Sequence, residues 1–251
     1  MASSLPPLSA HATQVVLCDL RRCTTQDLAH HRALLSANEK ARNAALGSAT
    51  LRDRDAHCRG LLRRHLALLL NTSAAALQLG AGKKGKPTLV GPAEQISFNL
   101  SHSGDYAVLA FHRSHPVGVD IEHITPTRDP LRLSRRFFSR EESDALAALS
   151  PENQLDAFYQ LWTLKEAYIK ARGDSIFDGL QAPRFKPGAL GHRLDARLDW
   201  SGAPAGEAWQ FWIDTPVPGY QLAVAQREAT HVVDDTAGQA SITVLDSPLL
   251  A

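Results

Sequence analysis

The sequence has no excess of charge of either sign and no hydrophobic segment long enough to cross a membrane. Its 27 lysines and arginines nearly balance its 26 aspartates and glutamates, which indicates neither a nucleic-acid nor a membrane partner. The longest apolar run, Leu66–Leu70, is far shorter than the roughly 20 residues of a membrane-spanning helix. The first residues, MASSLPPLSAHATQ, contain no basic region that leads into an apolar stretch. We therefore expect a cytosolic protein with no nucleic-acid and no membrane partner.

Cysteine is also scarce. Cys18, Cys23 and Cys58 are odd in number, and no two of them have the C-x-x-C spacing of many zinc and redox sites. The pattern therefore predicts neither a disulfide framework nor a structural zinc site, only ordinary intracellular thiols. With 251 residues, of which 21% are charged, the composition is that of a globular chain with one large or two small domains.

The first half of the chain predicts a strand, two helices and then three short strands. Gln14–Leu20 has strand character, and Ser36–Glu39 is a capping box that predicts a helix ending near Gly47. A second helix is predicted over Arg52–Leu70, because leucines recur there at helical spacing and arginines occupy the other side. Gly80–Pro92 is expected to be a loop. The strands expected after it, as an antiparallel meander, are Ile96–Leu100, Tyr106–Phe111 and Val117–Ile121.

The second half repeats this order. Ser139–Glu142 is another capping box, and Ser150 and Pro151 are expected to start a long helix that ends at Gly173. Further strands are predicted at Trp209–Asp214, Tyr220–Gln226 and Ile242–Leu245. We therefore predict an α+β fold with two similar halves, residues 1–115 and 116–251. Each half would be a long helix packed on a small antiparallel sheet, and a pseudo-twofold axis would relate the two.

Two acidic residues in one predicted strand are the first candidates for chemistry. Asp120 and Glu122 are two positions apart, so their side chains point to the same face of the strand, roughly 6.5–7 Å apart along the chain. Both carboxylates could bind one hard cation. The alternative is an amphipathic edge strand whose acidic side is solvated, and this segment alone does not decide between the two.

The long helix of the second half supplies an acid and a base on one face. Glu166 and Lys170 are four residues apart, which by itself is typical of a surface ion pair that contributes a few tenths of a kcal/mol. Together with Asp120 and Glu122 they offer three oxygen ligands and one cation. That combination is suited to holding Mg²⁺ on a substrate phosphate while the lysine neutralises further phosphate charge.

These segments closely resemble the signature motifs of the Sfp-type 4′-phosphopantetheinyl transferases. The two matching stretches are GVDIE, residues 118–122, and FYQLWTLKEAYIKARG, residues 158–173, with Phe137–Ser139 in the spacer between them. Upstream, Gly85–Pro87 and Asn99–Ser103 look like the cofactor-binding segments of that family, in the same order. The resemblance covers roughly residues 35–180 and is only general from Ala182 onward. It implies the fold of that family.

The resemblance also implies an activity and roles for the site residues. Members of the family transfer the 4′-phosphopantetheine arm of coenzyme A to a serine of an acyl or peptidyl carrier protein and release 3′,5′-ADP. By position, Asp120, Glu122 and Glu166 would face a Mg²⁺ ion. Glu166 would also take the serine proton, and Lys170 would neutralise phosphate charge. The chain length is typical of monomeric members.

For coenzyme A, the resemblance implies a second set of residues. Basic side chains would bind the 3′-phosphate, the Gly-Lys-Pro segment would lie along the adenine and its sugar, and polar side chains with Lys170 would reach the other phosphates. In that order the residues are Lys40, Arg42 and Arg59, then Gly85, Lys86 and Pro87, then Ser101 and His102. For the basic residues the alternative is a solvated helix face, and for Ser101 and His102 a polar strand end.

The segment from His123 to Arg136 is basic and gives no regular prediction. In the family this region faces the carrier protein, so its arginines would steer an acidic partner; these are Arg128, Arg132, Arg135 and Arg136.

Two other functions stay open. One is a Mg²⁺-dependent nuclease or phosphodiesterase, which the near-neutral charge disfavours. The other is a non-catalytic scaffold that binds coenzyme A or a carrier.

Overall fold

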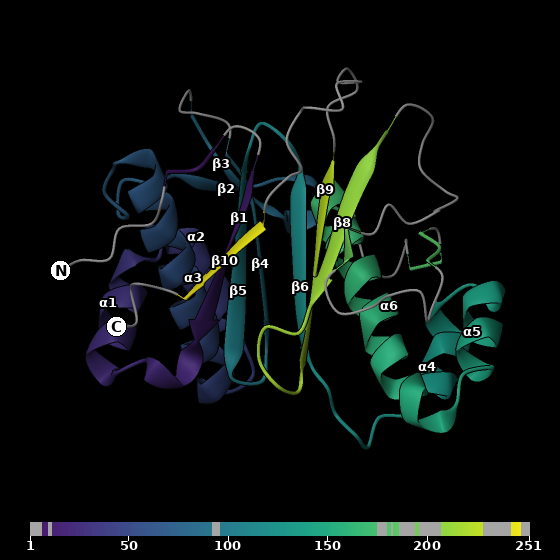
Figure 1. Ribbon diagram of the computed structural model, residues 1–251. Helices are drawn as coiled ribbons and strands as arrows, with labels where there is room; N and C mark the ends of the chain where they lie inside the picture. The colour runs from purple at the N-terminus through teal and green to yellow at the C-terminus, as the bar shows by residue number, and fades with distance from the viewer. Residues whose placement is uncertain are drawn as a thin grey trace.

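Two four-stranded sheets pack face to face, and each is covered on its outer side by a long helix (Figure 1). The computed structural model describes residues 7–9, 12–91, 96–174, 180–181, 183–185, 194–195, 207–227 and 242–246. The layers follow from three hydrophobic clusters. One lies between the sheets, one under the long helix of the first half and one under that of the second. The predicted α+β class with a helix on each small sheet is confirmed.

The first sheet has the strand order β10-β1-β5-β4. Its strands are β1 (Thr13–Asp19), β4 (Ile96–Ser103), β5 (Tyr106–Arg113) and β10 (Ile242–Asp246). β5 pairs antiparallel with both β1 and β4, while β10 runs parallel to β1. A strand close to the end of the chain therefore joins the sheet of the first half, a pairing that the sequence does not predict.

Three helices follow β1 and a short 3₁₀ turn, η1 (Leu20–Arg22). They are α1 (Thr25–Leu34), α2 (Ala37–Ala44) and α3 (Ala49–Leu70). The capping box that starts α2 is present as predicted, with Ser36 and Glu39 each bonded to the other's backbone amide. α1 was not predicted. Its signal is a capping box in which an aspartate, Asp27, takes the place of the usual glutamate opposite Thr24.

The expectation of a loop over residues 80–92 is wrong in part, because a small hairpin lies there. Its strands are β2 (Leu79–Ala81) and β3 (Pro87–Leu89), joined through η2 (Lys83–Gly85). Lys84 and Gly85 at the turn both have positive φ, 51° and 84°. The glycines and prolines in this stretch thus mark a tight hairpin turn, for which Gly85 supplies the backbone freedom.

The second sheet has the order β6-β9-β8-β7, with all neighbours antiparallel. Its strands are β6 (Val117–His123), β7 (Leu194–Asp195), β8 (Trp209–Asp214) and β9 (Tyr220–Arg227). The predicted three-stranded meander is therefore wrong at its last strand, because β6 pairs with β9 and starts the second sheet. Alternation of apolar residues marks a strand but does not choose between two possible partners.

The helices of the second half are α4 (Pro130–Phe137), α5 (Arg140–Ala147) and α6 (Pro151–Arg172). α5 begins with the predicted capping box. α6 has the predicted proline at its first turn and ends at Gly173, which adopts the left-handed conformation with φ 69°. α4 was not predicted, although Asp129 caps it and Pro130 begins it. None of the helices in the described ranges is long and apolar enough to cross a membrane.

A buried ion pair anchors a short helix to a long one in each half. Glu39, from the capping box of α2, accepts from the Arg63 guanidinium at 2.7 Å, and Glu142, from the capping box of α5, lies 2.8 Å from the Lys165 ammonium. All four side chains are almost fully buried. A repeated device of this kind is what a pseudo-twofold relation would produce. That relation, and the division at residues 115 and 116, stay predictions.

Candidate functional site

The two sheets meet along the facing edges of β4 and β6. Backbone amides of β6 donate to side chains of β4 at alternate positions, so side chains take the place of a strand partner along this edge. The contacts run from Val117 N to Ser97 Oγ (3.1 Å), from Val119 N to Asn99 Oδ1 (2.9 Å) and from His123 N to Ser103 Oγ (3.1 Å). This seam fixes the register between the two sheets at the position where β6 carries its acidic residues.

Alternation along β6 sends its two acids toward α6. Val117, Val119 and Ile121 face the first sheet and belong to the cluster between the sheets. Gly118, on the other face, lies so close to α6 that a Cβ atom there would be 2.0 Å from the Ala167 carbonyl oxygen. The helix therefore crosses β6 directly over Gly118, which brings the residues beside that crossing next to Asp120.

Lys170 is the centre of the resulting cluster. Its Nζ donates to Asp120 Oδ1 at 2.6 Å and to Ser101 Oγ at 3.0 Å, and lies 3.5 Å from Glu166 Oε2. The Ser101 hydroxyl in turn donates to Asp120 Oδ1 at 2.7 Å. Asp120 and Glu166 are buried, with exposed fractions of 2% and 7%. The structure thus brings together residues from β4, β6 and α6 that the sequence places far apart.

Burial and mutual repulsion shift the ionisation of this cluster. Burial, and then the charge of Asp120, raise the pKa of Glu166 to about 7, although Lys170 opposes the shift. Burial and Asp120 also raise the pKa of Glu122, whose Oε2 accepts from Ser103 Oγ at 2.9 Å. Burial disfavours the Lys170 ammonium, but the surrounding carboxylates outweigh it and raise its pKa. One cation therefore faces three acids, and a further positive charge would be favourable here.

The residues fit a hard divalent cation. Carboxylate oxygens are the ligands that Mg²⁺ prefers in proteins. The second oxygen of Asp120, Oδ2, is buried and has no hydrogen-bond partner, so it is a ready ligand atom. In this structure the carboxylate oxygens of Asp120, Glu122 and Glu166, all within the described ranges, do not all lie within 4.8 Å of one another. The Lys170 ammonium, 2.6 Å from Asp120 Oδ1, already supplies one positive charge to these carboxylates.

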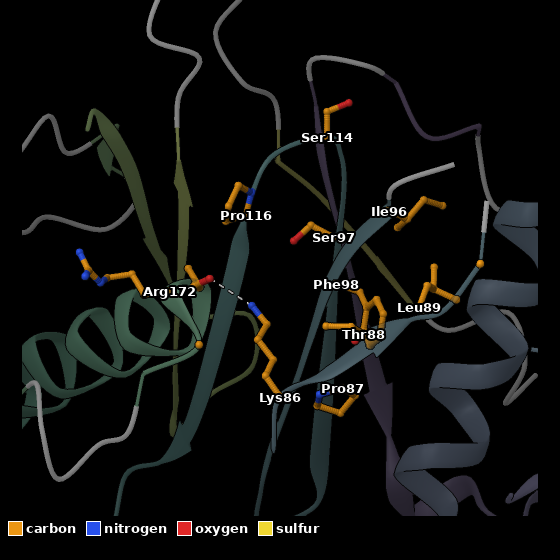
Figure 2. A pocket seen from close by; sticks show the side chains of 13 residues that line it. Lys86, Pro87, Thr88, Leu89, Ile96, Ser97, Phe98, Ser114, Pro116 and Arg172 are labelled. Carbon is orange, nitrogen blue, oxygen red and sulfur yellow. Dashed lines mark hydrogen bonds between the residues drawn. The ribbon is translucent and has the colours of Figure 1, made fainter. Parts of the chain in front are cut away.

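Lys86 and Pro87 line a cavity of about 460 Å³ that also borders the end of α6 (Figure 2). Lys86 Nζ reaches across it and donates to the carbonyl oxygens of Val117 and Ala171, each at 3.2 Å. Burial lowers the pKa of this ammonium to about 8. Ala171 also lines the cavity and directly follows Lys170 in α6, so the cavity and the carboxylate cluster meet at the end of the same helix.

The other basic residues predicted for the cofactor are spread over α2 and α3. Lys40 and Arg42 are exposed on α2. Arg59 donates to Asp55 Oδ1 at 2.7 Å, one turn earlier in α3. His102 has a lowered pKa, because of partial desolvation and then the charges of Arg54 and Lys170. Arg54, one of the arginines of α3, is therefore close enough to His102 for its charge to act on that ring, and no sequence motif assigns it to the cofactor.

Comparison with known proteins gives a consistent result for both halves. The sequence model described as 4′-phosphopantetheinyl transferase, N-terminal, matches residues 22–114, and that of the 4′-phosphopantetheinyl transferase superfamily matches residues 116–225. The chain is 37% identical over 153 residues to the 4′-phosphopantetheinyl transferase HetI of Nostoc sp., an alignment that covers 60% of this chain and 63% of HetI. It is 36% identical over 155 residues to the 4′-phosphopantetheinyl transferase of Bacillus subtilis, with 57% of this chain and 67% of the relative covered. With psf-1 of Bacillus pumilus the identity is 38% over 151 residues, 59% of this chain and 61% of psf-1. The chain therefore spans less than two thirds of the length of HetI and of psf-1.

Proposed function

The chain belongs to the 4′-phosphopantetheinyl transferase superfamily, and we propose that it transfers the 4′-phosphopantetheine arm of coenzyme A to a serine of an acyl or peptidyl carrier protein. The observation that carries the proposal is the buried cluster in which Lys170 contacts Asp120 and Glu166. A cytosolic monomer remains our expectation.

The reaction exchanges one phosphorus–oxygen bond for another. The serine oxygen bonds to the β-phosphorus of coenzyme A, the phosphoanhydride bond breaks, and 3′,5′-ADP leaves with the bridging oxygen. The serine proton goes to a base. Such transfers depend on alignment and on stabilising the negative charge of the leaving group, rather than on covalent chemistry by the protein.

Glu166 is the proposed base. It is a buried carboxylate whose pKa is raised toward neutrality, which suits a group that accepts a proton at physiological pH. Lys170, held beside it, would neutralise negative charge on the diphosphate. Asp120, Glu122 and Glu166 would hold Mg²⁺, which when bound neutralises phosphate charge. Asp120 Oδ2, buried without a partner, is the structural support for the metal assignment.

Coenzyme A would bind mainly to the first half, residues 1–115. Lys86 and Pro87 line the cavity beside the end of α6, and we assign the adenine and its sugar to that cavity, with Gly85 supplying the turn before it. Ser101 and His102 would reach phosphates. The 3′-phosphate would lie toward the basic residues of α2 and α3; these are Lys40, Arg42 and Arg59.

The carrier would bind to the second half, residues 116–251. Arg132, Arg135 and Arg136 are exposed on α4, so this short helix presents a basic surface. Arg128, just before it, lies over the Tyr159 ring at 5.5 Å. Complementary charge would steer the acidic helix of a carrier to this surface.

The direct test is intact mass measurement of a panel of apo-carriers incubated with the protein, coenzyme A and Mg²⁺. We expect at least one carrier to gain the mass of the phosphopantetheine arm. The Glu166→Gln variant should lose most of this transfer while still binding coenzyme A, because the amide cannot take the proton. Near-normal turnover in that variant would refute the base assignment. Cleavage of a nucleic acid or phosphodiester without modification of any carrier would favour the nuclease alternative.

A further inference from the structure

Cys23, His31 and His57 form a cluster on the helical side of the first sheet, and none of them has a part in the proposed transfer. Cys23 directly precedes the cap of α1, His31 lies in α1 and His57 lies in α3. One ligand atom from each, the cysteine sulfur and a nitrogen of each histidine, lies within 4.8 Å of the other two. We propose that this cluster binds a divalent transition-metal ion of the Zn²⁺ class.

The histidine pair is held rigidly in the helical layer. His31 is fully buried and His57 is 3% exposed, and their Nδ1 atoms lie 2.8 Å apart. Gly60 makes the close approach of the helices possible, since a Cβ atom there would be 2.3 Å from the Cβ of His31. The two Nδ1 atoms lie close enough to share one ion once the rings turn so that both nitrogen lone pairs point at it.

The hydrogen bonds define the proton positions in the metal-free cluster. Arg64 can only donate, and its Nη1 lies 3.3 Å from His31 Nε2, so His31 Nε2 accepts. The remaining proton of a neutral His31 is then on Nδ1, which donates to His57 Nδ1. The proton of His57 is left on Nε2, and this buried atom has no hydrogen-bond partner. The pair is therefore only partly satisfied by the protein around it.

Neutral imidazoles, nearby acidic residues and an adjacent cavity suit a cation with an open coordination position, although the Arg64 guanidinium opposes it. Burial lowers the pKa of His31 to about 4 and lowers that of His57, so both rings are neutral at pH 7, as metal ligands must be. Burial and the negative charges of Asp27 and Asp53 raise the pKa of the Cys23 thiol. Cys23 and His57 also line a cavity of about 350 Å³, which gives an ion access and room for a fourth ligand.

Binding would exchange protons for the metal. The sulfur–hydrogen bond of Cys23 breaks as the sulfur–metal bond forms, and that proton goes to solvent. The two Nδ1 atoms replace their mutual hydrogen bond with bonds to the ion, so the proton of His31 moves to Nε2 by way of solvent. Arg64 must then withdraw, because two donors would face each other. One proton is released for each ion bound, and Arg64 restrains the affinity.

The test is titration of the metal-free, reduced protein with Co²⁺ and then with Zn²⁺ against a chromophoric chelator. We expect one equivalent of Co²⁺ to give the thiolate charge-transfer absorption and the visible bands of a tetrahedral site. Cys23→Ser should abolish the charge-transfer absorption and weaken Zn²⁺ binding by more than about 100-fold, since loss of a ligand exceeds the effect of losing an outer partner. Arg64→Gln should instead strengthen Zn²⁺ binding by about 10-fold.

The matched control is His30→Ala, which removes an exposed histidine next to His31 and should leave binding unchanged. Circular dichroism and thermal unfolding of each metal-free variant exclude misfolding as the cause of a loss. Equal Zn²⁺ affinity in the wild type and Cys23→Ser, or no charge-transfer absorption in the wild type, would overturn the proposal. The carboxylate cluster contains no thiol, so cobalt bound there lacks this absorption and the result is independent of the transferase proposal.

Discussion

The crossing of α6 over Gly118 offers the sharpest test of how the site is positioned. In Gly118→Ala, the new Cβ would lie 2.0 Å from the carbonyl oxygen of Ala167 and 2.4 Å from the amide nitrogen of Ala171. Real Cβ atoms keep at least 3.0 Å from such neighbours, so the helix and strand must separate by about 1 Å. Both neighbours are backbone atoms, which cannot rotate away as a side chain would.

Two consequences of this separation can be measured. Overpacking of this kind destabilises by about 1–3 kcal/mol. A displacement of about 1 Å between Asp120 and the pair Glu166 and Lys170 should lower kcat by about 100-fold, because catalysis depends steeply on alignment. Thermal unfolding gives the first number, and carrier modification followed by intact mass gives the second.

Gly47→Ala is the matched control, because no atom lies within 4 Å of the position that its Cβ would take. It should leave both stability and kcat close to the wild type. If Gly118→Ala kept wild-type kcat and wild-type stability, the close crossing would not be what positions the cluster. If stability fell while kcat stayed unchanged, the contact would be structural only.

Three further predictions concern parts of the molecule away from Gly118. Lys165→Met should destabilise by about 3–5 kcal/mol in urea unfolding, since it leaves the buried Glu142 without its ion pair, and an effect below 1 kcal/mol would contradict this. Burial lowers the pKa of His65 from 6.5 to about 4, so the unfolded chain takes up its proton at higher pH than the folded one and stability falls as pH drops through that range. His65→Leu should therefore remove about 3 kcal/mol of the stability lost between pH 7 and pH 4, and an unchanged pH dependence would show that His65 is not its source. The double variant Arg135→Glu, Arg136→Glu should raise KM for the carrier more than it lowers kcat, and a salt dependence equal to that of the wild type would argue against charge steering.

The sequence predicts where helices begin and end better than it predicts which strands pair with one another. Capping boxes at Ser36 and Ser139, and the proline and glycine that bound α6, act over a few residues, and their helices lie where predicted. The pairing of β6 with β9 depends on the packing of the whole sheet, and alternation along Val117–His123 carries no information about it. The same holds for β10, whose partner is the first strand of the chain.

The site shows the same difference. Period-two alternation in β6 and period-four spacing in α6 predict that Asp120 lies on one face with Glu122 and Glu166 with Lys170, and in the structure the Lys170 ammonium lies 3.5 Å from Glu166 Oε2. The bond from Lys170 to Asp120 depends on the crossing at Gly118, which no local pattern predicts. Likewise, no spacing pattern predicts the group formed by Cys23, His31 and His57, because its two histidines come from different helices. The sequence alone gives no reason to place Arg54 near His102, because an arginine on a solvated helix face and an arginine in a phosphate site occur in the same kind of segment.

In the proposed site, Asp120 and Glu122 of β6 and Glu166 of α6 together hold one divalent ion against a diphosphate beside Lys170. Anomalous diffraction from crystals of the protein with Mn²⁺ and coenzyme A would locate this ion relative to the three carboxylates. We predict a single strong peak within bonding distance of Asp120, Glu122 and Glu166, next to the diphosphate of coenzyme A. A peak away from these three carboxylates, or a diphosphate remote from Lys170, would show that Asp120, Glu122 and Glu166 do not form the metal site.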